Sequence, residues 1–190
     1  MMFTKEIPMT RLEKGSVFPA FRFDTEKEEN LLSTDVIDRK TVFWVLRYIG
    51  CTVCRYDIHL IAQKYEEFTA KNAQVYVVMQ SDRTHVQNNL NSTGTVLPFS
   101  VICDPKMKIY DLLDIQPASS MDDLVKDRRE DLQKKAASAR ETGFTHGDYE
   151  GNEQQLPALF IVNEKGIVEY VRYAENIMDM PSVNEVISLL

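Results

Sequence analysis

The sequence predicts an α/β sandwich with a partly parallel central sheet. An almost continuous apolar segment at residues 42–49 is typical of a strand buried on both faces. Apolar residues spaced by three and four follow within residues 55–72, which indicates an amphipathic helix. Residues 74–80 form a second apolar strand. Together these segments make a strand–helix–strand unit, for which a right-handed crossover is expected.

The remaining elements follow in order along the chain. Residues 18–33 predict a peripheral hairpin, and residues 158–173 predict a closing hairpin whose turn contains Gly166. Pro181 and Ser182 mark the start of a last helix. The elements expected between the hairpins are a short helix at 81–90, a strand at 99–104 and a short helix at 106–113.

One segment interrupts this compact order. Residues 116–155 form a connection far longer than the usual length of about five residues. A helical apolar stripe runs through it, interrupted by Arg128 and Arg129; its members are Met121, Leu124, Val125, Leu132 and Ala136. The polar, Gly-rich residues 143–155 predict a mobile loop. We therefore expect a single domain over 1–190 with a helical and loop insertion, which is either a lid over a site or a remote surface feature.

Composition excludes several classes of function. The formal net charge of −7 argues against a nucleic-acid groove, because phosphate binding relies on clustered Lys and Arg. No apolar segment approaches the length of a membrane span, and the N-terminal residues carry no secretory leader pattern, so cytoplasmic residence and no membrane partner are expected. Three cysteines are too few for a disulfide scaffold.

Two of these cysteines form a pair that can take part in thiol chemistry. Cys51 and Cys54 are separated by two residues, directly after the apolar strand and at the expected start of the helix. A helix N-terminus stabilises a thiolate through its unpaired N–H groups and its positive dipole end. One helical turn also brings the two sulfurs within reach of each other, so that a disulfide can form with little backbone movement.

Other interpretations of the cysteines are weaker. Zinc would need further ligands, but only Cys103 and the scattered His59, His85 and His146 remain, none at ligand spacing. We therefore expect neither a metal nor another cofactor, and the histidines are interpreted as solvated or capping side chains. Cys51 and Cys54 could also be inert packed thiols, which is the interpretation favoured for Cys103.

Two charged residues near the pair are informative. Arg47 falls within the buried strand, where a guanidinium is costly unless it is paired or exposed at a site. It either lowers a thiolate pKa or holds an anionic group, or it forms a structural ion pair. Asp57 could transfer a proton, although an acid in the first helical turn also favours the helix dipole. Arg55 is interpreted as a solvated charge.

The chain resembles the thioredoxin-fold redoxins of the alkyl hydroperoxide reductase and thiol-specific antioxidant family. The segments that carry the resemblance are "KGSVFPAFRF", "FWVLRYIGCTVCRYDI", "PFSVICDPKMKIYDLL" and "QQLPALFIVNEKGIVEYVRY". The resemblance implies a thioredoxin-like three-layer sandwich with a mixed central sheet and a helical insertion before the closing hairpin. It also implies peroxiredoxin-like antioxidant redox chemistry.

The sequence departs from the peroxidase pattern of that family. In Pro-x-x-x-Thr-x-x-Cys, Cys54 takes the place of the peroxidatic cysteine, whereas Cys51 replaces the Thr and Arg47 replaces the Pro. Pro157 stands where the family has an Arg. It resembles instead the cis-proline of thioredoxin-like proteins, which implies that Leu156 and Pro157 shape a substrate groove.

Three hypotheses follow. In the first, a thiol–disulfide oxidoreductase, Cys51 is the more exposed sulfur and attacks a disulfide, and Cys54 resolves the mixed disulfide. In the second, a thiol peroxidase, Cys54 attacks peroxide and Cys51 condenses with it. The third is a non-catalytic redox sensor or binding module. The expected partners are a disulfide or peroxide substrate, a thiol reductant (a thioredoxin-like protein or a small thiol) and, by resemblance, a second copy in a homodimer.

Overall fold

The computed structural model describes residues 11–190; the first ten residues, where the sequence predicts no leader, lie outside this range. Seven strands form one sheet. They are β1 (Arg22–Thr25), β2 (Leu31–Leu32), β3 (Lys40–Val45), β4 (Ala73–Met79), β5 (Ser100–Cys103), β6 (Ala158–Val162) and β7 (Val168–Tyr173). Their order across the sheet is β2-β1-β5-β4-β3-β6-β7. Strands β3, β4 and β5 are parallel and the other neighbours are antiparallel, so the predicted mixed sheet is confirmed.

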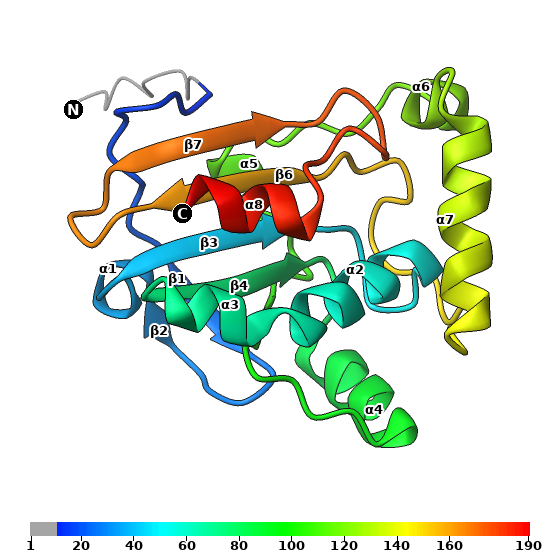
Figure 1. The fold of residues 1–190 in the computed structure, drawn as a ribbon, viewed down its shortest axis with the longest axis horizontal. Coiled ribbons are helices and arrows are strands. Elements are labelled where there is room, and N and C mark those ends of the chain that lie inside the picture. Colours follow the sequence, from blue (N-terminus) through cyan, green and yellow to red (C-terminus); the bar gives the residue numbers. More distant parts are fainter. Residues whose placement is uncertain (1–10) are drawn as a thin grey trace, which may run out of the picture.

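Eight helices surround the sheet in the described part of the chain. They are α1 (Ser33–Val36), α2 (Thr52–Gln63), α3 (Tyr65–Ala70), α4 (Arg83–Thr93), α5 (Lys108–Leu112), α6 (Met121–Val125), α7 (Arg129–Glu141) and α8 (Val183–Leu189). Figure 1 shows α2, α3 and α8 on one face of the sheet, α5 on the other face, and α7 at one side next to α2. None of the helices in residues 11–190 is long and apolar enough to cross a membrane.

The central strand β3 divides the core into two halves. Val42 and Trp44 belong to the apolar cluster under α2, α3 and α8. Phe43 and Val45 belong to the cluster on the α5 side. Since successive side chains of a strand point to opposite faces, this alternation explains why the strand is apolar at every position from Val42 to Val45.

Strand β3 ends at Val45, four residues earlier than the sequence predicts. Main-chain hydrogen bonds toward β4 continue at Leu46 and Arg47. Side chains satisfy other backbone groups: the Tyr110 hydroxyl donates to the Leu46 carbonyl at 2.6 Å, and the Ile49 N–H donates to the Ser81 hydroxyl at 2.8 Å. The chain is thereby released from the sheet before the cysteines. Arg47 consequently lies just past the end of β3 and not within it.

The insertion contains two helices where the sequence predicts one. Lys126 adopts a left-handed φ of 48° and separates α6 from α7. The two ends of the insertion meet, because Pro117 forms an antiparallel bridge with Gln155 and the Ala118 N–H donates to the Gln154 carbonyl at 2.9 Å. The insertion therefore leaves the sheet and returns to it at one place.

An ion pair fastens the insertion to the helix that carries the cysteines. Lys135 on α7 lies 2.6 Å from Asp57 on α2, and both side chains are largely buried. Burial raises the pKa of the Asp57 carboxyl, while the Lys135 ammonium acts in the opposite direction. A buried carboxylate without its cation is strongly destabilising.

We therefore expect Lys135→Met to lower the free energy of unfolding by on the order of 3 kcal/mol at pH 7, because Asp57 remains buried without a partner. Urea denaturation followed by circular dichroism measures this change. Lys134→Met, on the exposed side of the same helix, is the control, with an expected change within about 0.5 kcal/mol. Equal effects of the two substitutions would contradict a stabilising role of the pair.

Candidate active site

Cys51 and Cys54 lie where β3 gives way to α2, at the carboxyl edge of the parallel strands. Cys51 is the N-cap residue of α2, and its sulfur accepts a hydrogen bond from the Cys54 N–H at 3.4 Å. Both cysteines are free thiols. The first sulfur is therefore the one that the helix N-terminus supports, as expected for a thiolate.

Arg47 contacts this sulfur directly. Its Nη2 donates to Cys51 Sγ at 2.9 Å, and its Nη1 donates to the Glu153 carbonyl at 2.7 Å. Its Nε is buried and has no hydrogen-bond partner within residues 11–190, and no carboxylate of that range pairs with the guanidinium. The structural ion pair considered from the sequence is therefore not formed. The guanidinium is hydrogen bonded to the Cys51 sulfur instead.

The two thiols differ in acidity. Burial disfavours ionisation of Cys51, but hydrogen bonding with Cys54 and the charge of Arg47 outweigh it and lower the pKa of Cys51 to about 6. Burial and the neighbouring Cys51 sulfur raise the pKa of Cys54 well above its usual value, and Arg47 offsets this only in part. The surroundings therefore favour the thiolate at Cys51 and the protonated thiol at Cys54.

The prediction that Cys51 is the more exposed sulfur is wrong. Cys51 is 1% exposed and Cys54 is 4% exposed. Residues 142–154 of the insertion lie over the chain next to Cys51: the Gly147 N–H donates to the Gly50 carbonyl at 2.8 Å, and Arg55 donates to the Thr145 carbonyl at 3.0 Å.

The same segment differs from the mobile loop that its composition predicts. The Tyr48 hydroxyl is hydrogen bonded to His146, the Ser81 hydroxyl donates to Glu150, and Gln80 exchanges two hydrogen bonds with the backbone of Asn152. These contacts join the segment to the ends of β3 and β4. The part of the insertion that follows α7 therefore closes over the cysteines.

A cavity of about 370 Å³ lies beside Cys51 under this cover. Arg47 and Cys51 line its inner end, and the exposed Arg140 lines it from α7. Its walls are mostly apolar and come largely from the insertion; they include Met121, Leu124, Val125, Leu132, Ala136 and Ile177. This arrangement can admit a small organic or inorganic oxidant to a buried thiolate.

The expected cis-proline is also wrong. No cis peptide bond occurs within residues 11–190, so the Leu156–Pro157 bond is trans. The Pro157 carbonyl accepts a hydrogen bond from the Ala174 N–H at 3.1 Å, which extends the β6–β7 hairpin. Trans is the default geometry of a peptide bond before proline. Leu156 packs against the core.

Pro157 nevertheless lies near the second cysteine. It shares the lining of a small cavity of about 20 Å³ with Cys54, Asp57 and Lys135. Asp57, the weaker sequence candidate, is thus close to the thiol that must lose a proton during disulfide formation. Sequence reasoning missed Lys135, because its position near the apolar stripe of the insertion gives no sign of a partner on α2.

Other residues considered from the sequence lie apart from the cysteine pair. Burial raises the pKa of Cys103 to about 12, as expected for a packed thiol. His85 is hydrogen bonded to Asp82 at 2.6 Å and lies 3.4 Å from Glu150. Their ligand atoms are close enough to hold a metal ion, but this exposed group is equally explained as an ion pair that fastens the covering segment. His59 stacks on Tyr56.

Removing the guanidinium should change the acidity of Cys51. We expect Arg47→Gln to raise the Cys51 pKa by at least about one unit, because an adjacent opposite charge is lost. The rate of iodoacetamide alkylation of Cys51 between pH 4 and 10 measures this pKa, since the thiolate is the reactive form. Its midpoint near pH 6 should move upward. Arg140→Gln removes a cation from the same cavity and should leave the midpoint in place; identical profiles for all three proteins would rule out the role of Arg47.

The cover should depend on the absence of a side chain at residue 50. A methyl group at Gly50 would overlap the carbonyl oxygen of Asp148, so Gly50→Ala should displace the covering segment. Loss of the Gly147–Gly50 hydrogen bond is expected to speed Cys51 alkylation by up to about tenfold. Gly166→Ala, which strains a positive φ in open space, is the control for lost stability alone. Unchanged alkylation of Gly50→Ala would argue against this cover.

Comparisons with known proteins identify the family and the fold of the chain. The family model described as the AhpC/TSA family matches residues 15–171. The fold is similar to that of a 1-Cys peroxiredoxin of yeast mitochondria (TM-score 0.64, 15% identity, 93% of this chain and 73% of that one). It is also similar to a mutant of peroxiredoxin 6 of Arenicola marina (TM-score 0.66, 12% identity, 93% and 70%). A search of curated proteins found no match. The thioredoxin-like fold is thus confirmed, and the chain belongs to the AhpC/TSA family as a peroxiredoxin-like oxidoreductase that acts on peroxides or disulfides.

Proposed function

We propose that this protein is a dithiol oxidoreductase in which Cys51 is the attacking thiolate and Cys54 is the resolving thiol. The observation that carries the proposal is the contact of 2.9 Å between Arg47 Nη2 and Cys51 Sγ at the N-cap of α2. The guanidinium makes no hydrogen bond to Cys54 Sγ, and burial together with the Cys51 sulfur raises the pKa of Cys54. The nucleophile is therefore the first cysteine of the pair.

With a disulfide substrate, the Cys51 thiolate attacks one sulfur and the substrate S–S bond breaks. One substrate thiolate leaves and takes up a proton, and a mixed disulfide remains on Cys51. Cys54 then loses its proton, for which Asp57 is the nearby acceptor in the shared small cavity, and attacks Cys51 Sγ. The second substrate thiol leaves, and a Cys51–Cys54 disulfide remains.

A second candidate is peroxide reduction at the same sulfur. The unpaired Nε of Arg47 supports it, because a buried donor without a partner is costly unless a substrate oxygen accepts its hydrogen bond. The Cys51 thiolate would attack one peroxide oxygen, the O–O bond would break, and the leaving oxygen would take up a proton. The Cys51 sulfenic acid would then condense with the Cys54 thiol, with loss of water, to form the same disulfide.

The burial of the pair favours small oxidants in both cases. A protein disulfide cannot approach a sulfur that is 1% exposed unless the covering segment moves. Peroxide attack by Cys54, which follows from the family pattern, is disfavoured because this thiol is protonated near neutral pH.

We extend the proposal to a thiol reductant, either a small thiol or a thioredoxin-like protein, to a cytoplasmic location and to a homodimer.

Cysteine variants test the assignment. Cys51→Ser should abolish consumption of both hydrogen peroxide and a small disulfide, because the nucleophile is lost. Cys54→Ser should react once and stop, leaving one sulfenic acid or one mixed disulfide on Cys51, which mass spectrometry detects. Cys103→Ser is the matched control and should keep full turnover.

The ratio of kcat/KM for hydrogen peroxide and for the small disulfide decides between the two candidates. Sulfenic acid on Cys54 in the Cys51→Ser variant would overturn the assignment of roles. Negligible turnover with every reductant, combined with a change in the covering segment on oxidation, would instead indicate the redox sensor.

A further inference from the structure

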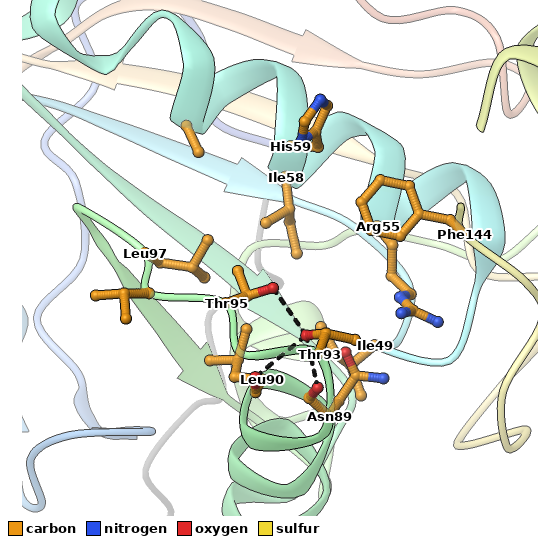
Figure 2. A pocket seen from close by; sticks show the side chains of 12 residues that line it. Ile49, Arg55, Ile58, His59, Asn89, Leu90, Thr93, Thr95, Leu97 and Phe144 are labelled. Atoms are coloured by element: carbon orange, nitrogen blue, oxygen red, sulfur yellow. Dashed lines mark hydrogen bonds between the residues drawn. The ribbon is translucent and has the colours of Figure 1, made fainter. Parts of the chain in front are cut away.

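A further cavity, which neither Cys51 nor Cys54 lines, lies between α2 and α4. Its volume is about 240 Å³. Figure 2 shows Ile58 pointing into it from α2 and Leu90 and Thr93 bordering it from α4. The walls are mainly apolar and include Ile49, Ile58, Ala62, Leu90, Leu97 and Phe144. Nothing in the redox chemistry proposed above uses this space.

One cation borders the cavity. Figure 2 shows Arg55 extending from α2 at the end opposite Leu97, next to Phe144. Its Nη1 donates to the Thr145 carbonyl at 3.0 Å, and its guanidinium carbon lies 5.1 Å from the centre of the Phe144 ring. No carboxylate within residues 11–190 forms an ion pair with it, and burial alone lowers its pKa. The solvated charge predicted from the sequence is thus a partly buried cation without a counter-ion.

The two threonine hydroxyls of the cavity are already hydrogen bonded. The Thr93 and Thr95 hydroxyls share a hydrogen bond of 2.7 Å, and Thr93 also contacts the Asn89 carbonyl at 3.0 Å. The His59 ring packs against Phe144 with 5.6 Å between the ring centres. A ligand would therefore find one free positive charge at one end and apolar contacts along the rest.

We propose that this cavity binds a small amphipathic carboxylate, with the carboxylate on Arg55 and a short apolar tail against Ile58 and Leu90. A guanidinium offers a carboxylate charge-assisted hydrogen bonds. The volume is below the range of about 300–1,000 Å³ that holds drug-sized ligands, so the tail is short.

The site is an effector site for the cysteines. Arg55 directly follows Cys54 in α2, and it holds Thr145 at the start of the segment that covers Cys51. A carboxylate that fixes Arg55 also packs beside Phe144, so it stabilises the closed position of this segment. Bound ligand therefore reduces the access of reagents to Cys51.

Octanoate is the probe, titrated into the full chain by calorimetry. We expect saturable binding of one molecule, and at least about tenfold weaker binding by Arg55→Gln, because a charge-assisted hydrogen bond is lost. Arg129→Gln, which removes an exposed cation from α7, should bind like the unchanged protein. Ala62→Phe should fill the cavity and abolish binding while thermal unfolding shows a folded protein. Octanol should bind no better than octanoate binds Arg55→Gln.

The effector role is read from iodoacetamide alkylation of Cys51, which saturating octanoate should slow in the unchanged protein but not in Ala62→Phe. Absence of saturable binding, or binding that neither Arg55→Gln nor Ala62→Phe weakens, would overturn the site. Binding without slower alkylation would overturn the effector role. Both measurements are independent of turnover, so their failure is distinguishable from failure of the proposed redox function.

Discussion

The contact between Arg47 and Cys51 is the interaction on which the site depends. An ionised sulfur that is almost fully buried is costly unless nearby charges and hydrogen bonds replace the water that it has lost. Arg47 supplies a charge and a donor at 2.9 Å, and the Cys54 N–H supplies a second donor. Because the guanidinium has no carboxylate partner, the Cys51 thiolate is the counter-ion of Arg47. The two groups therefore stabilise each other's ionised forms.

This charge pair depends in turn on the insertion. The Nη1 of Arg47 is held by the Glu153 carbonyl, at the end of the segment that covers the cysteines. The Asp57–Lys135 ion pair and the Gly50–Gly147 hydrogen bond join the insertion to α2 and to the residue before Cys51. The insertion thus orients the cation that ionises the nucleophile, and it also excludes water around it. Displacing the cover would weaken both effects at once.

The sequence was informative where structure is local. The strand–helix–strand unit, the closing hairpin and the start of α2 follow from apolar periodicity and turn residues, and the cost of an unpaired buried charge drew attention to Arg47. The burial of Cys51 was not predictable in this way. It results from main-chain hydrogen bonds between distant segments, such as Gly147 to Gly50, which side-chain identity does not encode. The cis-proline was inferred from resemblance alone, and the Leu156–Pro157 bond is trans.

The exchange of roles that we propose for the two cysteines follows from where the cation lies. In the family pattern a proline occupies the position of Arg47, and the last cysteine is the one that attacks. Here the Arg47 guanidinium extends from the end of β3 to Cys51, the N-cap of α2, which lies one helical turn before Cys54. A cation stabilises the thiolate that it contacts, so moving the cation moves the nucleophile to Cys51. Cys54 lies beside Asp57, where a protonated thiol is suited to the second step.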